Sequence, residues 1–558
     1  MKHLLLSLVF TISIFSVNAQ ESISQQSKID AIFSKWDTQN SPGGTVGVIK
    51  EGKLIFSKGY GMANLDYNIP NQPKTVFRIG STSKQFTAAT IILLSQEGKL
   101  SLEDTLIKFF PNFPSYANDV TIQHLLNHTS GVRDYLILAR LSGLSADDHY
   151  TDKMVEKWLT NQQELNFKPG DEFLYSNSGY WLLSQIVKKV SGVSMAKYAE
   201  KNIFIPLGMH TTFFNDNHKQ VVKNRASGYR PNKKGGYAIR MTNLDMIGDG
   251  GVFTTVEDLA KWDASFYNSK TLNQDFWNQM TKVGTLNNGD KINYAAGLSI
   301  ANNKGLKMIH HSGAFVGYKA EMLRFPEVQF SVIVLANRAD SDPTQMAQRI
   351  ANIFLKDEFK KEKRVVTKKP KTKSKKNVSI KLSKEELSVF VGDYWSEISK
   401  SSRKLIVKDG MLNYVRSNGR ATKMRPIAKN KFQMIGPRVP VILDVNLKGK
   451  VKEFTLRVPN AEPLTFKVYK PVISYSATDL KTYSGDYYSA ELDVVYSFKM
   501  KNNRIFLFVK GNPVGEVKSI KQNLLNISGR QTFEFNENRD MFRLSMLGRV
   551  KNVKFVKK

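Results

Sequence analysis

Cysteine is absent from this chain of 558 residues. Its absence excludes disulfides, thiol nucleophiles, thiolate metal sites and a lipid anchor on cysteine. A chain without disulfides relies on the size of its hydrophobic core, and this length is sufficient for several cores. At roughly 150 residues per domain, the length predicts three or four domains.

Acidic residues are few compared with basic ones. The chain has 82 Lys and Arg against 49 Asp and Glu, which gives a formal net charge of +33. In a cytosolic protein this charge would suggest nucleic acid. For an exported protein we expect no nucleic acid, and anionic envelope polymers or a membrane surface become the candidate partners. A basic face that is simply solvated is an equal alternative.

Long apolar runs are also missing, apart from one at the start. Lys2 precedes an apolar stretch from Leu4 to Val17, and the small residues before Ala19 are typical of a cleavage site. Residues 1–19 therefore have the features of a secretory signal peptide. The stretch is shorter than the roughly 20 residues that span a bilayer, so a retained anchor is the weaker alternative. We expect export to the periplasm or medium after cleavage near Ala19.

A possible nucleophile stands at the start of an apolar run, in the sequence Ser81-Thr82-Ser83-Lys84. In a helix, Ser81 and Lys84 share one face, so the amine can reach the hydroxyl. A desolvated lysine can accept the serine proton and make the serine a nucleophile for acyl transfer. In a chain so rich in lysine, this spacing alone is a weak signal.

Two later motifs strengthen it. Tyr175-Ser176-Asn177 follows the turn at Pro169-Gly170 and opens a helical apolar run that extends to Val190. His311-Ser312-Gly313 precedes an alternating segment, residues 314–325, and we place this motif at the head of an edge strand. The two motifs supply a phenol, an amide side chain and a strand, which a site with only the serine and the lysine would not have.

With these motifs in this order, residues 29–355 resemble the serine beta-lactamases and penicillin-binding proteins, in particular the class C beta-lactamase and D-aminopeptidase branch. The phrases at Ile122–Gly131 and Gly250–Trp262 agree with that branch. The resemblance implies an α+β fold, with an antiparallel sheet flanked by helices and a helical subdomain. Periodicity independently predicts a helix over 24–38, hairpins over 45–60 and 315–336, and a helix over 342–355.

The resemblance also implies the roles of individual residues. Ser81 would be the acylated nucleophile and Lys84 its proton acceptor. Tyr175 would transfer a proton and activate water for deacylation. Asn177 would orient the substrate amide. The amides of Ser81 and Ala314 would form the oxyanion hole.

His311 departs from the beta-lactamase and carboxypeptidase pattern, which commonly has lysine at that place. Imidazole is mostly neutral near pH 7, so recognition of a substrate carboxylate is in doubt. D-aminopeptidases and related amidases and esterases of the branch carry histidine there. Gly313 would let the substrate backbone approach the strand. His310 points to the other face of a strand and is interpreted as structural.

His124 and His128, four apart on an expected helix, could form half of a metal site. No third ligand accompanies them, so we expect no metal and no cofactor.

The remainder of the chain has a different character. Residues 356–380 are basic and almost free of apolar residues, which predicts a linker after a catalytic domain of residues 20–355. Leu387–Ser396 (LSVFVGDYWS) recurs as Leu480–Ser489 (LKTYSGDYYS), and alternating segments follow each copy. This pattern predicts two small antiparallel β-barrels, at 381–472 and 473–558. Similar paired barrels follow the catalytic domain in some D-aminopeptidases.

The leading hypothesis is an exported serine hydrolase that acts through an acyl-enzyme. Its substrate would be a small peptide, amide or ester, with D-amino-acid-containing or cell-wall-related compounds favoured. One alternative is a beta-lactamase or D-alanyl-D-alanine carboxypeptidase. Another is a non-catalytic envelope-binding protein that uses its barrels and basic linker.

Overall fold

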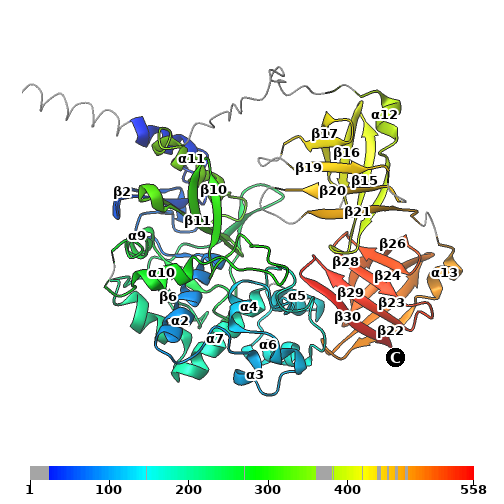
Figure 1. Ribbon diagram of the computed structural model, residues 1–558, viewed down its shortest axis with the longest axis horizontal. Helices are drawn as coiled ribbons and strands as arrows, with labels where there is room; N and C mark the ends of the chain where they lie inside the picture. Colours follow the sequence, from blue (N-terminus) through cyan, green and yellow to red (C-terminus); the bar gives the residue numbers. More distant parts are fainter. Residues whose placement is uncertain are drawn as a thin grey trace, which may run out of the picture.

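The computed structural model describes residues 24–145, 147–268, 270–359, 380, 382–417, 419–436, 441–448, 451–458, 463–471 and 475–558. The predicted signal peptide, residues 1–19, and most of the predicted linker, residues 356–380, lie outside the described residues. Figure 1 shows the α+β part in blue to green, one barrel in yellow and a second in orange to red.

A six-stranded antiparallel sheet forms the centre of the α+β part, and its strands come from distant segments of the chain. Its order is β10-β11-β12-β13-β1-β2, so the N-terminal hairpin pairs with the last strand of the C-terminal meander. Both predicted hairpins are confirmed. The second begins later than predicted, because Val316 and Gly317 form a turn with Val316 at φ 47°. The strands are β1 (Gly44–Lys50), β2 (Lys53–Tyr60), β10 (Ser299–Asn303), β11 (Leu306–Phe315), β12 (Tyr318–Phe325) and β13 (Phe330–Ala336).

Each face of this sheet is covered by helices. Alternate residues of β13 enter opposite cores, with Val332 and Val334 on one side and Ile333 and Leu335 on the other. The helix at residues 24–33 and α11 (Pro343–Phe354) cover the first side. Asp342 caps α11 by accepting a hydrogen bond from the Gln345 amide, 3.1 Å away. This is the helix start that the Asp-Pro pair predicts.

The helical part covers the other face of the sheet. Its centre is α2 (Lys84–Gln96), which is apolar on nearly all sides and packs against α7 (Asn177–Ser191). Its other helices are α3 (Leu106–Phe109), α4 (Ile122–Leu126), α5 (Tyr135–Leu141), α6 (Asp152–Asn161), α8 (Met195–Ala199), α9 (Val256–Ala264) and α10 (Gln274–Met280). Its short strands are β3 (Met62–Asn64), β4 (Ile69–Pro70), β5 (Phe77–Arg78), β6 (Phe213–Phe214), β7 (Tyr229–Pro231), β8 (Tyr237–Ile239) and β9 (Val252–Thr254).

Two antiparallel barrels follow, as the repeat predicts. The first is closed. In the second, nine strands run in the order β25-β24-β23-β22-β30-β29-β28-β27-β26. The outermost strands of that order, β25 and β26, are separated in the chain by Val517 alone, so the sheet curls back on itself and is nearly closed.

The strands of the first barrel are β14 (Gly392–Ser396), β15 (Ser401–Lys408), β16 (Met411–Arg416), β17 (Ala421–Ala428), β18 (Lys431–Met434), β19 (Ile442–Asn446), β20 (Glu453–Arg457) and β21 (Leu464–Tyr469). Those of the second are β22 (Gly485–Ser489), β23 (Val494–Lys501), β24 (Arg504–Val509), β25 (Asn512–Glu516), β26 (Lys518–Lys521), β27 (Leu524–Ile527), β28 (Gln531–Phe535), β29 (Met541–Met546) and β30 (Val550–Lys557).

The repeated sequence has the same structure in both barrels. A short helix, α12 (Lys384–Ser388) or α13 (Ala477–Lys481), begins with a capping box and leads into the first strand. Tyr394 and Tyr487 are fully buried there. Their hydroxyls donate to the carbonyls of Phe390 and Tyr483, at 2.7 and 3.3 Å. The repeat is therefore the unit with which each barrel begins, called the barrel-opening unit below. Its buried tyrosine covers the end of the barrel core.

Within the described residues, no helix combines the length and the apolar character that crossing a membrane requires.

Candidate active site

The predicted serine and lysine lie side by side at the junction of a 3-10 turn, residues Gly80–Ser83, and helix α2. The Lys84 ammonium is 3.4 Å from the Ser81 hydroxyl. Lys84 is completely buried, and its nitrogen also donates to Asn177 Oδ1 at 3.0 Å and to the Asp249 carbonyl at 2.6 Å. These acceptors hold the Lys84 nitrogen beside the serine, and in its neutral form this amine can take the serine proton.

Two glycines bring strand β11 against this turn. Gly80 has φ 53°, and a Cβ on it would lie 2.8 Å from the Ala314 nitrogen. A Cβ on Gly313 would lie 1.8 Å from the Ile79 carbonyl oxygen. Gly313 is thus required for packing of the strand against the turn, a reason that the sequence did not indicate. The close contact places the backbones of Ser81 and Ala314, the predicted oxyanion hole, next to each other.

The position of the His311 motif needs a correction. His311 to Gly313 lie inside β11, and β11 is flanked by β10 and β12, so it is not the edge strand of the sheet. However, β10 pairs only with residues 306–310 of β11. Among the described residues, no strand pairs with the other side of residues 311–315. This side faces the 3-10 turn Gly80–Ser83, which carries the predicted nucleophile and is called the nucleophile turn below.

Tyr175 lies over the lysine. The Lys84 nitrogen is 4.9 Å from the centre of its ring, and the Arg549 guanidinium is 5.1 Å from the same ring. The Tyr175 hydroxyl is buried and has no hydrogen-bond partner among the described residues. Its hydroxyl is therefore available to a bound substrate or water.

Asn177 is held from behind by Asp134. The buried Asp134 carboxylate accepts hydrogen bonds from the Asn177 amide nitrogens, at 3.1 Å from the backbone and 2.8 Å from the side chain. It also caps α5 by accepting from the Leu136 amide at 3.0 Å. Asn177 is the first residue of α7, as the motif predicts. The hydrogen bonds from Asp134 orient the Asn177 side chain so that its carbonyl oxygen, Oδ1, faces Lys84.

His311 is present at the site without a charge. Burial and the nearby Lys84 ammonium lower the pKa of His311 to about 3. Its Nδ1 donates to the Ser312 carbonyl at 2.7 Å, so its Nε2 accepts from the Tyr294 hydroxyl at 2.9 Å. Both ring nitrogens are engaged, and the ring offers no cation to a substrate carboxylate. His310 points to the opposite face and pairs with the buried Glu321 at 3.1 Å, as its structural interpretation requires.

The histidine pair considered as half of a metal site is separated by a helix end. α4 stops at Leu126, and His128 has φ 59°, so His128 is not on the predicted helix. The backbone amide of Thr121 donates to His124 Nδ1, and that of Ser176 donates to His128 Nδ1. Both rings therefore accept hydrogen bonds from the backbone. The His128 ring also packs against the Tyr175 ring in a tilted arrangement, with 4.1 Å between the ring centres.

The site opens into a cavity of about 660 Å³ with a basic lining. Among its described lining residues, Asp249 is the one carboxyl group, and burial raises the pKa of that group. Cationic side chains contribute from several segments: Arg78, Arg140, Arg240, Lys319 and Arg549. The lining therefore gives the cavity a positive electrostatic potential.

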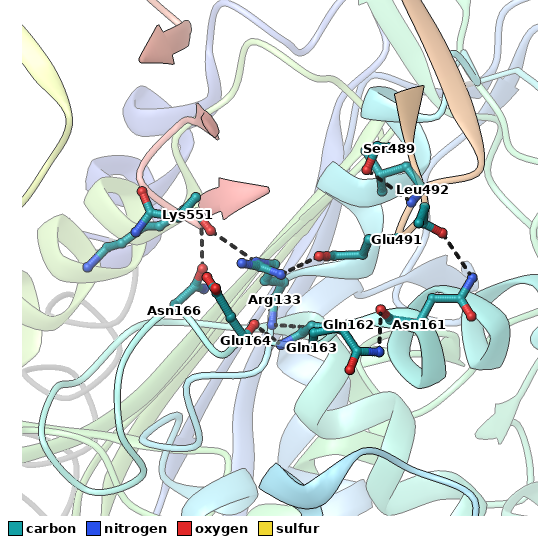
Figure 2. A network of polar contacts seen from close by, with 12 residues as sticks. Arg133, Asn161, Gln162, Gln163, Glu164, Asn166, Ser489, Glu491, Leu492 and Lys551 are labelled. Carbon is teal, nitrogen blue, oxygen red and sulfur yellow. Dashed lines mark hydrogen bonds and ion pairs between the residues drawn. The ribbon is translucent and has the colours of Figure 1, made fainter. Parts of the chain in front are cut away.

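Arg549 comes from the second barrel, in the turn between β29 and β30. Asn166 fixes this turn from the α+β part: its side chain donates to the Arg549 carbonyl at 2.9 Å and accepts from the Lys551 amide at 2.8 Å. Figure 2 shows the neighbouring contact, in which the buried Arg133 guanidinium donates to Glu491 at 2.6 Å and to the Lys551 carbonyl at 3.0 Å. The barrel is therefore docked directly on the wall of the cleft.

Comparison with known proteins identifies the family. The model of the Beta-lactamase family matches residues 29–354, more than half of the chain. The chain belongs to this family. Penicillin-binding protein 4* of Bacillus subtilis is 28% identical over 344 residues, which are 58% of this chain and 74% of the relative. The D-aminopeptidase of Gluconobacter oxydans is 26% identical over 310 residues, which are 56% of this chain and 58% of that enzyme.

A structural relative extends beyond the catalytic region. The octameric penicillin-binding protein homologue from Pyrococcus abyssi aligns with a TM-score of 0.54 at 25% identity. The alignment covers 80% of this chain and 99% of that one, so it includes part of the barrel region.

Sequence reasoning missed three groups at this site. Asp134 could have been identified as a helix cap, because it precedes an apolar run, but its bonds to Asn177 depend on the fold. The Asp249 carbonyl is a backbone group with no sequence signal. Arg549 is one of 82 basic residues, and nothing in its local sequence indicates a place in the cleft.

Proposed function

We propose that this protein is an exported serine hydrolase that forms an acyl-enzyme on Ser81 with small peptide or amide substrates. The observation that carries this proposal is the buried Lys84 amine, 3.4 Å from the Ser81 hydroxyl and oriented by Asn177. Penicillin-binding and D-aminopeptidase relatives support amides and peptides, including those with D-residues, over other acyl compounds.

In the first half of the reaction, the Ser81 oxygen attacks the substrate carbonyl while its proton passes to Lys84. The amides of Ser81 and Ala314 stabilise the negative charge on the tetrahedral oxygen. The proton then goes to the leaving amine. In the second half, Tyr175 and Lys84 take a proton from water, which attacks the acyl-enzyme and releases the acid.

Arg549 would recognise an anionic group of the substrate in place of His311. The Arg549 side chain is 42% exposed. The carboxylate of Asp134, with which it forms an ion pair, is 3.7 Å away, a long contact for a charged hydrogen bond. A planar guanidinium binds a carboxylate through two parallel hydrogen bonds. Because His311 is neutral, the cation for such a group has to come from another residue. The second barrel supplies Arg549, 5.1 Å from the Tyr175 ring.

The nucleophile is tested by covalent labelling. A fluorophosphonate should label wild-type protein at Ser81, and Ser81→Ala should abolish labelling while leaving the unfolding temperature unchanged. Lys84→Met should slow labelling by roughly a hundredfold or more, because proton transfer of this kind contributes about 10²–10⁴-fold. Labelling that survives Ser81→Ala would overturn the proposal.

The role of Arg549 is tested with paired substrates. Arg549→Ala should raise KM roughly tenfold or more for a D-peptide with a free carboxylate, and should leave its amidated analogue unaffected. Arg543→Ala removes a cation from the same barrel, where it pairs with the exposed Glu164. This control variant should have the same KM as wild type for both substrates. Equal losses for both substrates in Arg549→Ala would contradict carboxylate recognition.

The basic lining also supports a second candidate, a beta-lactamase or D-alanyl-D-alanine carboxypeptidase, because both substrate classes bear a carboxylate. Nitrocefin turnover and release of terminal D-alanine measure these activities, compared with cleavage of D-alanine p-nitroanilide. We place these activities second because the neutral His311 stands where such enzymes commonly have lysine.

A further inference from the structure

A group of metal-ligating side chains lies at the rim of the cleft, apart from the catalytic residues. His149, His218 and Asp245 come from the loop after α5, the segment after β6 and the segment before β9. Their ligand atoms all lie within 4.8 Å of one another. His218 Nδ1 is 2.9 and 3.0 Å from the two carboxylate oxygens, and His149 Nε2 is 3.4 Å from one of them.

These separations suit a tetrahedral metal ion. Zinc binds nitrogen and carboxylate oxygen at about 2.0–2.2 Å, so its ligand atoms stand roughly 3.3–3.6 Å apart. Of the separations from the carboxylate to the two rings, the 3.4 Å to His149 falls in this range and the 2.9 Å to His218 is shorter. Small rotations of the two rings would therefore admit an ion between the three side chains.

The carboxylate is already oriented for this role. The backbone amide of His218 donates to Asp245 Oδ1 at 2.5 Å, which is the kind of outer hydrogen bond that orients a ligand. His149 is 45% exposed, which leaves a solvent-facing position for a water as fourth ligand.

The surroundings select the kind of ion. Arg78 and Arg225 line a small cavity together with His218. These cations disfavour a metal ion that is bound only by electrostatic attraction to carboxylates. Calcium and magnesium prefer oxygen ligands, whereas imidazole suits zinc, copper and nickel. The two imidazoles therefore point to a borderline transition metal.

We propose that His149, His218 and Asp245 bind a zinc-like divalent transition metal that joins three segments of the chain, two of which line the cleft. Two of these segments carry residues that line the cavity, namely Tyr150 beside His149, and Leu244 and Met246 on either side of Asp245. The third segment, with His218, lines the small neighbouring cavity. A bound ion would hold these segments together, so it would stabilise the wall without touching Ser81 or Lys84.

The test uses the untagged full chain and Co²⁺ as a spectroscopic probe. Wild type should bind one Co²⁺ with a visible ligand-field absorption, and Zn²⁺ should displace it. His149→Ala and Asp245→Asn should each weaken Co²⁺ binding at least tenfold. His210→Ala changes an exposed histidine elsewhere and should bind as wild type does.

A second measurement is the unfolding temperature. Zn²⁺ should raise it in wild type and in His210→Ala, because an ion that binds the folded state stabilises it, and should not raise it in His149→Ala. Circular dichroism without metal checks that each variant is folded. If Asp245→Asn is not folded, it is replaced by His149→Gln, because His149 is half-exposed and tolerates substitution better. Co²⁺ affinity in the folded His149 variant equal to that of wild type would overturn the proposal, as would a wild-type protein that binds no Co²⁺ at millimolar concentration.

Discussion

At the scale of single residues, the site depends on groups that hold others in place. Lys84 is oriented by Asn177, and Asn177 is oriented by the buried carboxylate of Asp134. Misplacement of a reacting group by about 1 Å can cost roughly a hundredfold in rate. The residue behind the asparagine should therefore matter almost as much as the asparagine.

Asp134→Ala tests this dependence. The change leaves two amide donors of Asn177 without their acceptor, and we expect the rate of fluorophosphonate labelling of Ser81 to fall roughly 10–100-fold. The matched control is Asn273→Ala, which removes the cap of α10 by taking away the acceptor of the Phe276 amide, 2.8 Å away. The control should lose about 1–2 kcal/mol of stability. Asp134→Ala should lose more, because each buried donor left without an acceptor costs about 1–3 kcal/mol. Only Asp134→Ala should label slowly, and equal labelling rates would contradict the role of Asp134.

The buried histidine next to the site makes a prediction about acid stability. Its pKa is about 3 in the folded protein and about 6.5 in an unfolded chain, so between these values the unfolded state binds a proton that the folded state refuses. Stability should therefore fall as the pH drops below about 6.5, by up to about 1.4 kcal/mol per pH unit from this group.

His311→Gln removes this titration. Urea unfolding at pH 7 and pH 5 should show that the variant loses about 2 kcal/mol less than wild type over that interval. His310→Gln serves as the control of opposite sign. Burial lowers the pKa of His310, but its hydrogen bond and ion pair with Glu321 outweigh burial and raise it, so its contribution is present below about 6.5 and lost at higher pH. Parallel pH curves for His311→Gln and wild type would contradict the assignment.

At the scale of elements, the approach of β11 to the nucleophile turn decides the geometry. Gly313→Ala would place a Cβ 1.8 Å from the Ile79 carbonyl oxygen, so strand and turn must separate. We expect a lower unfolding temperature and loss of Ser81 labelling. Gly250→Ala is the control for stability, because its added Cβ would meet nothing closer than 3.7 Å. A Gly313→Ala protein with wild-type stability and labelling would show that the two elements are not tightly coupled.

Local elements could be predicted from the sequence where a signal is short-ranged. The hairpin of β1 and β2, the Asp-Pro start of α11 and the repeated barrel-opening unit all follow from alternation, turns and caps within a few residues. The errors arise where the partner is distant. β11 was predicted to be an edge strand, because the sequence does not show that β10 pairs with half of its length. His128 was predicted to lie on a helix, but α4 ends after five residues, before His128.

At the scale of the whole molecule, the second barrel completes the cleft. Arg133 lies next to Asp134 in sequence, and its guanidinium bonds Glu491 and Lys551 of the barrel. Arg133, which contacts the barrel, is thus next in the chain to Asp134, which orients Asn177. Ser81, Lys84, Tyr175 and Asn177 could be predicted from motifs, but this coupling could not, because it joins segments that have no common pattern.

Arg133→Ala tests the coupling. Arg133 is 1% exposed, and its loss would leave the nearly buried Glu491 carboxylate without its cation, which costs about 3–5 kcal/mol in comparable pairs. The barrel should then separate from the hydrolase domain before either unfolds, so urea unfolding should change from one transition to two. Ser81 labelling should slow, and KM for carboxylate-bearing substrates should rise as it does in Arg549→Ala.

The control for this experiment is a second ion pair across the same interface. Arg543 and Glu164 are 2.7 Å apart but 37% and 55% exposed, so Arg543→Ala should cost at most about 1 kcal/mol. It should preserve a single transition and normal labelling. If the two variants behave alike, the buried Arg133 contact is not what holds the barrel against the cleft. If only Arg133→Ala loses carboxylate-dependent binding, the barrel acts as part of the catalytic site, because its docking is what keeps Arg549 in place.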